Sequence, residues 1–262
     1  MSFWGLLEIT ALVIWGIMTL LWLLSLVLKD AGIVDIFWGL GYVIVNWVAF
    51  FVSPNEALPR HWLLNIIVTL WGLRLFLHLF RRNVGKPEDF RYQEFRRKYG
   101  KKFWWFSYLQ TFMLQGTLIF IISTPLVIAQ YSSTPRNLGF LDYFGLLLFV
   151  IGFFFEAVGD IQLTQFKKNA ANKGKVLKTG VWKYTRHPNY FGDATEWWGF
   201  YLIAAAVPFG FLTIFSPLIM TFFLIKVSGV AMLERTLAEK KPGYKEYMQT
   251  TNAFIPWIPK SK

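Results

Sequence analysis

Long apolar runs constrain the fold of this chain more than any other feature. An α-helix needs about 20 apolar residues to cross the hydrocarbon of a bilayer. Runs of this kind lie at about residues 5–28, 33–53, 61–80, 107–131 and 140–160. A further apolar block at about 189–230 is too long for one helix and is interrupted at Val207-Pro208-Phe209-Gly210, so we divide it in two. The sequence therefore predicts an all-α polytopic integral membrane protein with seven transmembrane helices.

The distribution of basic residues predicts the orientation of these helices. Segments 81–104, 161–192 and 231–262 hold nine, seven and six Lys and Arg residues, whereas 54–60 and 131–139 hold one each. Basic loops stay in the cytoplasm, so the three rich segments should be cytoplasmic. We therefore expect the N-terminus outside, the C-terminus in the cytoplasm and one membrane domain over residues 1–262.

Charge and composition limit the kinds of partner that the chain can bind. The formal charge is +12, but the basic residues lie between or after apolar runs, which favours membrane lipids or an anionic cofactor over nucleic acid. The chain has no cysteine, which excludes disulfides, thiolate nucleophiles and iron–sulfur clusters. Its three histidines lie in separate elements without a carboxylate at ligand spacing, so we expect no metal site. The oligomeric state stays open.

Several ionisable side chains are predicted inside the membrane helices or at their ends, where each costs a few kcal/mol at least. Three pairs are spaced three or four residues apart and so share a helix face. Such residues either snorkel and form structural ion pairs, or line one water-accessible cavity on the cytoplasmic side. The set comprises Asp35, which begins the second apolar run, and the six residues expected to line such a cavity, Arg74, His78, Glu156, Asp160, Asp193 and Glu196.

The segment from Gly180 to Asp193 is the richest in polar groups. Pro188 has no N–H to lose in the first turn of a helix, so the sixth helix should begin there, with its N-terminal amides facing the cytoplasm. Arg186 and His187 precede that helix and suit a diphosphate or a carboxylate. Further hydrogen-bonding groups that suit a nucleotide come from Tyr184, Asn189, Tyr190, Asp193 and Glu196.

This segment, RHPNYFGD followed by EWWG, resembles the C-terminal domain of the steroid 5α-reductases. Glu156 and Asp160 before it, and Glu234, Gly243-Tyr244 and Phe254-Ile255-Pro256 after it, belong to the same resemblance. The upstream runs at 71–74, 81–83, 88–92 and 114–116 make the chain especially similar to the bacterial subgroup known as domain of unknown function 1295. Isoprenylcysteine carboxyl methyltransferases carry a similar RHPxYxG segment.

The resemblance implies an NADPH-dependent oxidoreductase of the bacterial inner membrane. It implies reduction of a carbon–carbon double bond in a lipid-like substrate of the sterol, enone or polyprenyl type. Residues 5–131 would form the substrate side, and residues 140–262 would hold NADPH in a cavity facing the cytoplasm. Asp160, Tyr184, Asn189 and Asp193 would contact the cofactor, and Lys167 would replace a family arginine as a phosphate partner. The full predicted cofactor-binding set is Arg74, Arg82, Asn83, Arg91, Tyr92, Glu156, Asp160, Lys167, Tyr184, Arg186, His187, Asn189, Tyr190, Asp193, Glu196 and Glu234.

The position of the proton donor in the steroid enzymes is occupied by a different residue in this chain. Where they have a tyrosine, this chain has Trp71, whose indole has no proton to transfer at a useful pKa. Asp35 and His78 are then the candidate catalytic residues, and a structural pair is the alternative.

Two other functions stay open. One is an S-adenosylmethionine-dependent methyltransferase of a membrane-bound or prenylated acceptor, and the other is a non-enzymatic lipid-binding or transport protein. The basic segment 81–104 favours NADPH, because a single arginine satisfies the one carboxylate of S-adenosylmethionine.

Overall fold

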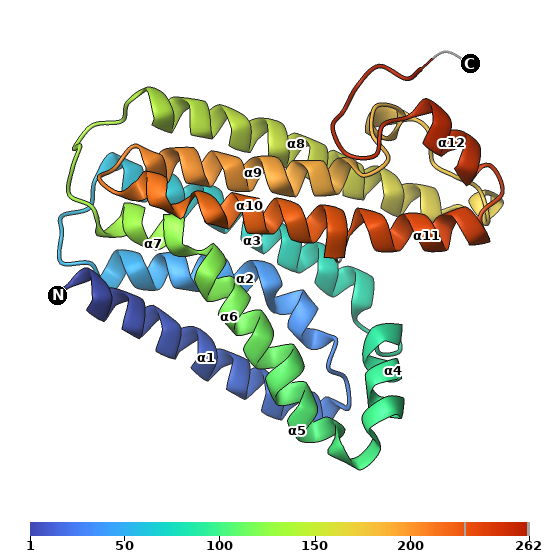
Figure 1. Cartoon of the computed structure of the whole chain (residues 1–262), viewed down its shortest axis with the longest axis horizontal. Coiled ribbons are helices and arrows are strands. Elements are labelled where there is room, and N and C mark those ends of the chain that lie inside the picture. The colour runs from blue at the N-terminus through green and yellow to red at the C-terminus, as the bar shows by residue number, and fades with distance from the viewer. Residues whose placement is uncertain (228, 261–262) are drawn as a thin grey trace. The chain divides into compact units, whose positions relative to one another are not determined.

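The chain folds into helices and connecting loops, which confirms the all-α prediction (Figure 1). The computed structural model describes residues 1–227 and 229–260, so the last two residues of the predicted C-terminal region lie outside the described residues. Short 3-10 and π-helical turns join some of the α-helices. The α-helices are α1 (Phe3–Leu28), α2 (Ile33–Val52), α3 (Pro59–Asn83), α4 (Phe90–Tyr99), α5 (Phe103–Ser107), α6 (Leu114–Ile122), α7 (Thr124–Tyr131), α8 (Phe140–Lys168), α9 (Pro188–Ala205), α10 (Phe215–Phe222), α11 (Val230–Lys240) and α12 (Tyr244–Thr250).

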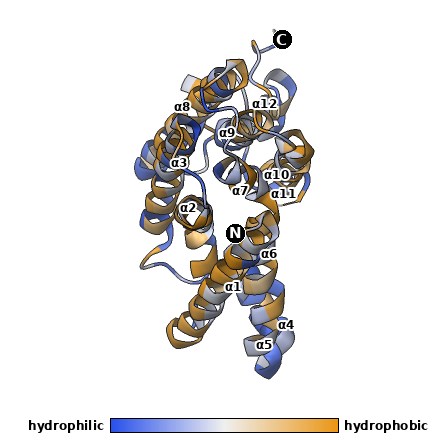
Figure 2. Ribbon diagram, turned by 90° about the vertical axis from the view of Figure 1, so that its left-hand side faces the viewer, coloured by the Kyte–Doolittle hydropathy of each residue, from blue (hydrophilic) through white to orange (hydrophobic). Residues whose placement is uncertain are grey.

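Six helical stretches among the described residues are long and apolar enough to cross a membrane. They are Phe3–Leu28, Ile33–Val52, Pro59–Asn83, Phe90–Ile122, Phe140–Lys168 and Gly210–Val227. Figure 2 shows apolar residues along most of α1 and hydrophilic residues in much of α4. The predicted sixth span, α9, is not one of the six, because its 18 residues include Asn189, Asp193 and Glu196.

The fourth span also differs from its predicted bounds of 107–131. The structure extends it back to Phe90 and ends it at Ile122, with Ser123 between α6 and α7. Pro125 lies in the first turn of α7, and a proline ring cannot continue the hydrogen-bond ladder of a preceding helix. The apolar run therefore continues to Tyr131 as two helices.

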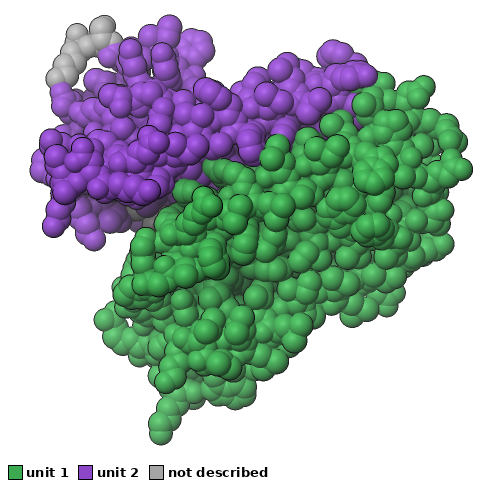
Figure 3. Space-filling model, turned by 180° about the vertical axis from the view of Figure 1, so that it is seen from behind, with its two compact units in different colours: residues 1–139, 204–213 green, residues 140–203, 214–262 purple. Residues whose placement is uncertain are grey.

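Contacts divide the chain into two compact units (Figure 3). Unit 1 comprises residues 1–139 and 204–213, and unit 2 comprises residues 140–203 and 214–262. In unit 1, α2 packs against α3, and Asn46, Asn65 and Gln130 form a fully buried group of hydrogen-bonded amides.

Unit 2 is built on close packing of α8 against α9. Gly145, Gly152 and Gly159 recur every seven residues of α8 and therefore lie along one face of it. A methyl group added at Gly145 would lie 2.6 Å from the carbonyl oxygen of Gly199 on α9, and one added at Gly152 would lie 2.6 Å from that of Gly192. Because the numbers rise along α8 as they fall along α9, the two helices are antiparallel.

This packing leads to a prediction about Gly192. In Gly192→Ala, the new methyl group would lie 2.5 Å from the backbone nitrogen of Glu156, so the two helices must move apart. Overpacking of this kind costs about 1–3 kcal/mol. We expect a lower thermal midpoint in detergent. Gly16→Ala on α1 is the matched control, because no atom beyond the neighbouring backbone of α1 lies within 4 Å of its added methyl group. Equal midpoints for both variants would contradict the close packing.

Candidate functional site

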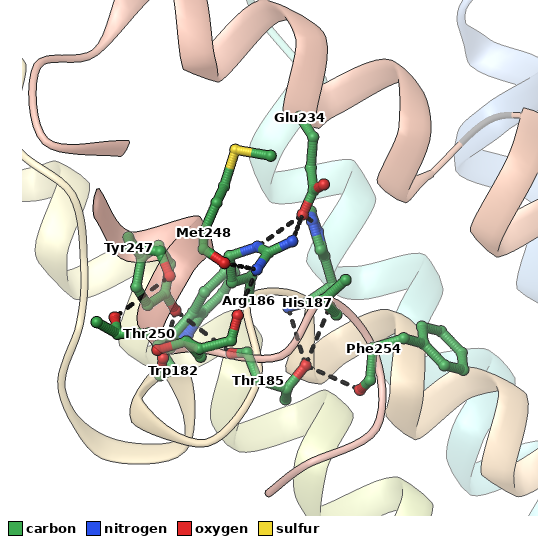
Figure 4. Close-up of polar contacts among 11 residues, drawn as sticks. Trp182, Thr185, Arg186, His187, Glu234, Tyr247, Met248, Thr250 and Phe254 are labelled. Carbon is green, nitrogen blue, oxygen red and sulfur yellow. Dashed lines mark hydrogen bonds and ion pairs between the residues drawn. The ribbon is translucent and has the colours of Figure 1, made fainter. Parts of the chain in front are cut away.

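A buried ion pair connects the start of α9 to the C-terminal part of unit 2 (Figure 4). The guanidinium of Arg186 donates from Nε to Oε1 of Glu234 on α11 at 2.7 Å, and its Nη2 also lies 2.7 Å from that oxygen. Its Nη1 donates to the carbonyl oxygens of Met248, at 3.0 Å, and Thr251. The Arg186 side chain is 7% exposed. Its donors are therefore occupied by the protein itself.

His187, Thr185 and Tyr247 extend this contact. Nε2 of His187 lies 3.3 Å from Oε1 of Glu234, and the hydroxyl of Thr185 donates to the carbonyl oxygen of Phe254 at 2.8 Å. The hydroxyl of Tyr247 donates to the carbonyl oxygen of Trp182. We call Arg186, His187 and Glu234, with Thr185 and Tyr247, the tail clasp, because these residues hold segment 248–254 against the start of α9.

The clasp stabilises the charged form of Glu234. Burial alone would raise the pKa of this carboxyl group. Hydrogen bonds from His187 and Arg186, together with their charges, outweigh burial and hold the pKa below its ordinary value. Nearby, burial and the charge of Glu234 raise the pKa of Tyr244 to about 12, so its hydroxyl stays protonated at neutral pH.

The direction of the Glu234 shift predicts a pH dependence of stability. A carboxyl group with a depressed pKa in the folded state stabilises the fold above its ordinary pKa of 4.5 and loses that contribution as the pH falls below it. We expect the thermal midpoint in detergent to fall between about pH 5 and pH 3.5. In Glu234→Gln the midpoint should be lower at neutral pH and should change less over that range. An unchanged pH profile in the variant would argue against the clasp.

Four predicted acidic residues of α8 and α9 are buried, and three of them lie where the two helices pack together. A methyl group added at Gly152 would meet the side chain of Glu196, and one added at Gly192 would meet that of Glu156. Each of these two glutamates thus packs over a glycine of the opposite helix. Closer to the start of α9, Asn189 donates from Nδ2 to Oδ1 of Asp160 at 3.1 Å. The acidic side chains are Glu156, Asp160, Asp193 and Glu196, none more than 8% exposed.

The other predicted residues of unit 2 lie around the same end of α9. Tyr190 stacks on the imidazole of His187 with ring centroids 5.7 Å apart. Tyr184 is 43% exposed, and its backbone carbonyl accepts a hydrogen bond from the N–H of Trp257 at 2.9 Å. Lys167 lies in the last turn of α8. The structure thus brings Asp160 and Asn189 together, and His187, Tyr190 and Glu234 together.

A second polar group lies in unit 1, and we call it the Asp35 cluster. Oδ2 of Asp35, in the first turn of α2, lies 2.6 Å from Nη2 of Arg91 on α4. Its Oδ1 accepts hydrogen bonds from the hydroxyl of Tyr92 at 2.8 Å and from Nε2 of Gln115 at 3.0 Å. Tyr92 is 5% exposed. The cluster therefore fixes a carboxylate, a guanidinium and a phenol in mutual contact.

The remaining predicted residues of unit 1 all lie on α3; they are Arg74, His78, Arg82 and Asn83. Arg74 and His78 are half-buried and one turn apart, as their spacing predicted. Arg82 donates from Nε to the side-chain oxygen of Asn83 at 3.1 Å. The roles of these residues, and the prediction that residues of both units share one cavity, stay predictions.

Sequence reasoning missed three residues of these groups. Gln115 was noted only as part of a family motif, although an amide inside an apolar run is itself a signal. Thr185 and Tyr247 lie within or near recognised motifs, but their contacts with backbone carbonyls 69 and 65 residues away leave no local pattern.

Comparisons with known proteins identify relatives of this chain by sequence. The family described as "Protein of unknown function (DUF1295)" matches residues 21–251. An uncharacterized protein of Schizosaccharomyces pombe is 26% identical over an alignment of 264 residues, gaps included. The alignment covers 90% of this chain and 75% of that protein. No solved structure matches this chain.

Two partial matches are to proteins with a named activity. A steroid 5-alpha-reductase, DET2, of Gossypium hirsutum is 35% identical over 68 residues, 26% of each protein. A probable O-methyltransferase, ustE, of Ustilaginoidea virens is 44% identical over 46 residues, 18% of this chain and 16% of that protein. Each match covers a minor part of both proteins.

Proposed function

The chain belongs to the DUF1295 family, and we propose that it is a membrane-embedded, NADPH-dependent reductase of a carbon–carbon double bond in a lipid-like substrate. The observation that carries the proposal is the partial match to a steroid 5-alpha-reductase. The polar groups at the start of α9 support it, because a nucleotide needs hydrogen-bond partners of that kind. The six candidate spans support a substrate that comes from the bilayer.

The residues around the start of α9 fit a nucleotide in part. Asp160 and Asn189, already in contact, offer an acceptor and a donor suited to ribose hydroxyls or a carboxamide. Tyr184 is exposed enough to meet a ligand. Arg186 fits less well as a phosphate partner, because its guanidinium is held by Glu234 and by carbonyl oxygens. We propose that Lys167, in the last turn of α8, supplies charge for the phosphates.

The Asp35 cluster is the proposed source of the proton. Reduction of an alkene adds a hydride to one carbon and a proton to the other, and NADPH supplies the hydride when bound. Asp35 contacts Arg91 and accepts the hydrogen bond from Tyr92, so Tyr92 is the member of this pair whose O–H acts as the donor. We therefore propose Tyr92 as the acid and Asp35 as the residue that positions it. His78 stays an alternative.

We propose that α9 is a seventh span and that both polar groups face the cytoplasm. At 1.5 Å per residue, its 18 residues reach about 27 Å, close to the thickness of a bilayer core of about 30 Å. Glu196 packs over Gly152 of α8, Asn189 contacts Asp160 of α8, and Asp193 is buried. A seventh span also agrees with three cytoplasmic basic segments. The bacterial inner membrane is the proposed location.

A methyltransferase is the second candidate, and the match to the probable O-methyltransferase favours it. S-adenosylmethionine also carries a ribose, which Asp160 and Asn189 could hold equally well. The two candidates therefore differ in the charge of the ligand rather than in the groups at the start of α9.

Identification of the bound nucleotide tests the proposal. The protein should be extracted in mild detergent, and the small molecules that co-purify with it should be identified by mass spectrometry. We expect NADP(H). S-adenosylmethionine in its place would transfer the assignment to the methyltransferase.

A further inference from the structure

A basic cavity of about 270 Å³ lies within unit 2 where α8 ends, and we call it the α8-end pocket. Its volume would hold roughly nine waters at about 30 Å³ each, which is also enough for a phosphate with the glycerol oxygens beside it. None of the described residues that line it is acidic. The side chains that determine its chemistry are Phe166, Lys167, Asn169, Asn172, Lys173 and Lys241.

Hydrogen bonds hold several of these side chains in place. Nζ of Lys241 donates to the carbonyl oxygen of Lys175 at 2.9 Å, which uses one of the three donors of the ammonium group. Nδ2 of Asn172 donates to the carbonyl oxygen of Phe166 at 3.1 Å. Oδ1 of Asn169 accepts from the N–H of Ala171 at 3.0 Å, which leaves its amide nitrogen as a donor. The pocket is therefore lined by oriented donors and by three lysines.

The length of α8 places the pocket at the level of lipid headgroups. Its 29 residues span about 43 Å, whereas the hydrocarbon core is about 30 Å thick. The last turn carries Lys167 and Lys168, the kind of residue that lies among lipid phosphates. Phe166 adds an apolar wall next to these charges.

We propose that the α8-end pocket binds the phosphate of an anionic membrane phospholipid. Lysine ammonium groups bind phosphate as point charges, and three of them with no acidic neighbour in the lining favour a ligand with net negative charge. The aromatic wall and the position at the end of a candidate span favour a lipid phosphate over a soluble one. The proposal needs no nucleotide, but Lys167 is also the proposed phosphate partner of NADPH, so the test changes Lys173 and Lys241 instead.

The test compares lipid retention by native mass spectrometry. Protein in mild detergent is mixed with phosphatidylglycerol or with zwitterionic phosphatidylcholine. We expect selective retention of phosphatidylglycerol, reduced about tenfold in the double variant Lys173→Gln/Lys241→Gln, which loses two cations of the pocket. The control Lys98→Gln/Lys101→Gln removes the same charge from segment 81–104 and should retain the lipid like the wild type.

Competition and folding measurements separate the alternatives. Inorganic phosphate, added in excess, should not displace phosphatidylglycerol, and displacement would overturn the proposal in favour of a soluble phosphate ligand. Equal retention of phosphatidylcholine, or unchanged retention by the double variant, would also overturn it. Thermal midpoints without lipid verify folding. The exposed single variant Lys173→Gln should show a smaller loss in the same direction.

Discussion

Replacing Arg186 by alanine is expected to destabilise the protein by about 3–5 kcal/mol, because it leaves a partly buried carboxylate without its partner. Glu234 is only 16% exposed and receives two contacts at 2.7 Å from the guanidinium. The carbonyl oxygens of Met248 and Thr251 would lose a donor as well. We expect a large fall in the thermal midpoint in detergent and faster proteolysis of the segment after α12.

Two comparisons isolate the ion pair from general damage. Arg235→Ala removes the exposed arginine next to Glu234 and should have little effect. The double variant Arg186→Ala/Glu234→Gln should be less destabilised than the sum of the single variants, because no buried charge is left unpaired. If Arg186→Ala were as stable as Arg235→Ala, the clasp would not hold the tail.

The second large effect is expected at Asp35. Asp35→Asn keeps the size of the side chain but removes the carboxylate that pairs with Arg91 and accepts a hydrogen bond from the hydroxyl of Tyr92. If Tyr92 is the acid and Asp35 positions it, reduction should slow by about 10²–10⁴, the usual contribution of a general acid. The rate of reduction should fall at least as far in Tyr92→Phe, which removes the hydroxyl proton and keeps the ring.

Binding and control measurements distinguish catalysis from structure. Both variants should bind NADPH with wild-type affinity, and kcat rather than KM should change. Asp30→Asn is the matched control, because the carboxylate of Asp30 accepts from the N–H of Gly32 and lies outside the Asp35 cluster. Full activity in Tyr92→Phe would exclude Tyr92 as the acid and leave His78 as the candidate.

Features that depend on local patterns could be predicted from the sequence. The apolar runs predicted α1, α2, α3 and α8 near their observed positions, and the missing N–H of Pro188 predicted the first residue of α9. The four-residue spacing of Glu156 and Asp160 predicted a shared face of α8. These predictions use the period of a helix and the chemistry of proline, which act within a few residues.

Features that depend on contacts between residues far apart in the sequence could not be predicted. Arg186 was predicted as an anion ligand, but its guanidinium contacts Glu234, 48 residues later in the sequence. Arg91 contacts Asp35 across 56 residues, and only the packing of α4 near the start of α2 reveals it. The sequence also does not show what packs against the glycines of α9, which the structure places against α8. The polar residues of α9 distinguish it from the six apolar spans.

The most direct test of the nucleotide assignment is a titration of the detergent-solubilised protein with NADPH, NADH and S-adenosylmethionine at low and moderate salt. We predict tightest binding of NADPH, with a preference that shrinks as salt screens the phosphate contacts. Asn189→Ala and Asp193→Ala should each weaken NADPH binding about tenfold or more, the cost of about 1–3 kcal/mol for a lost hydrogen bond. The control Asn137→Ala, at an exposed loop position, should not. Tighter binding of S-adenosylmethionine, or equal affinity for NADH and NADPH, would contradict the account.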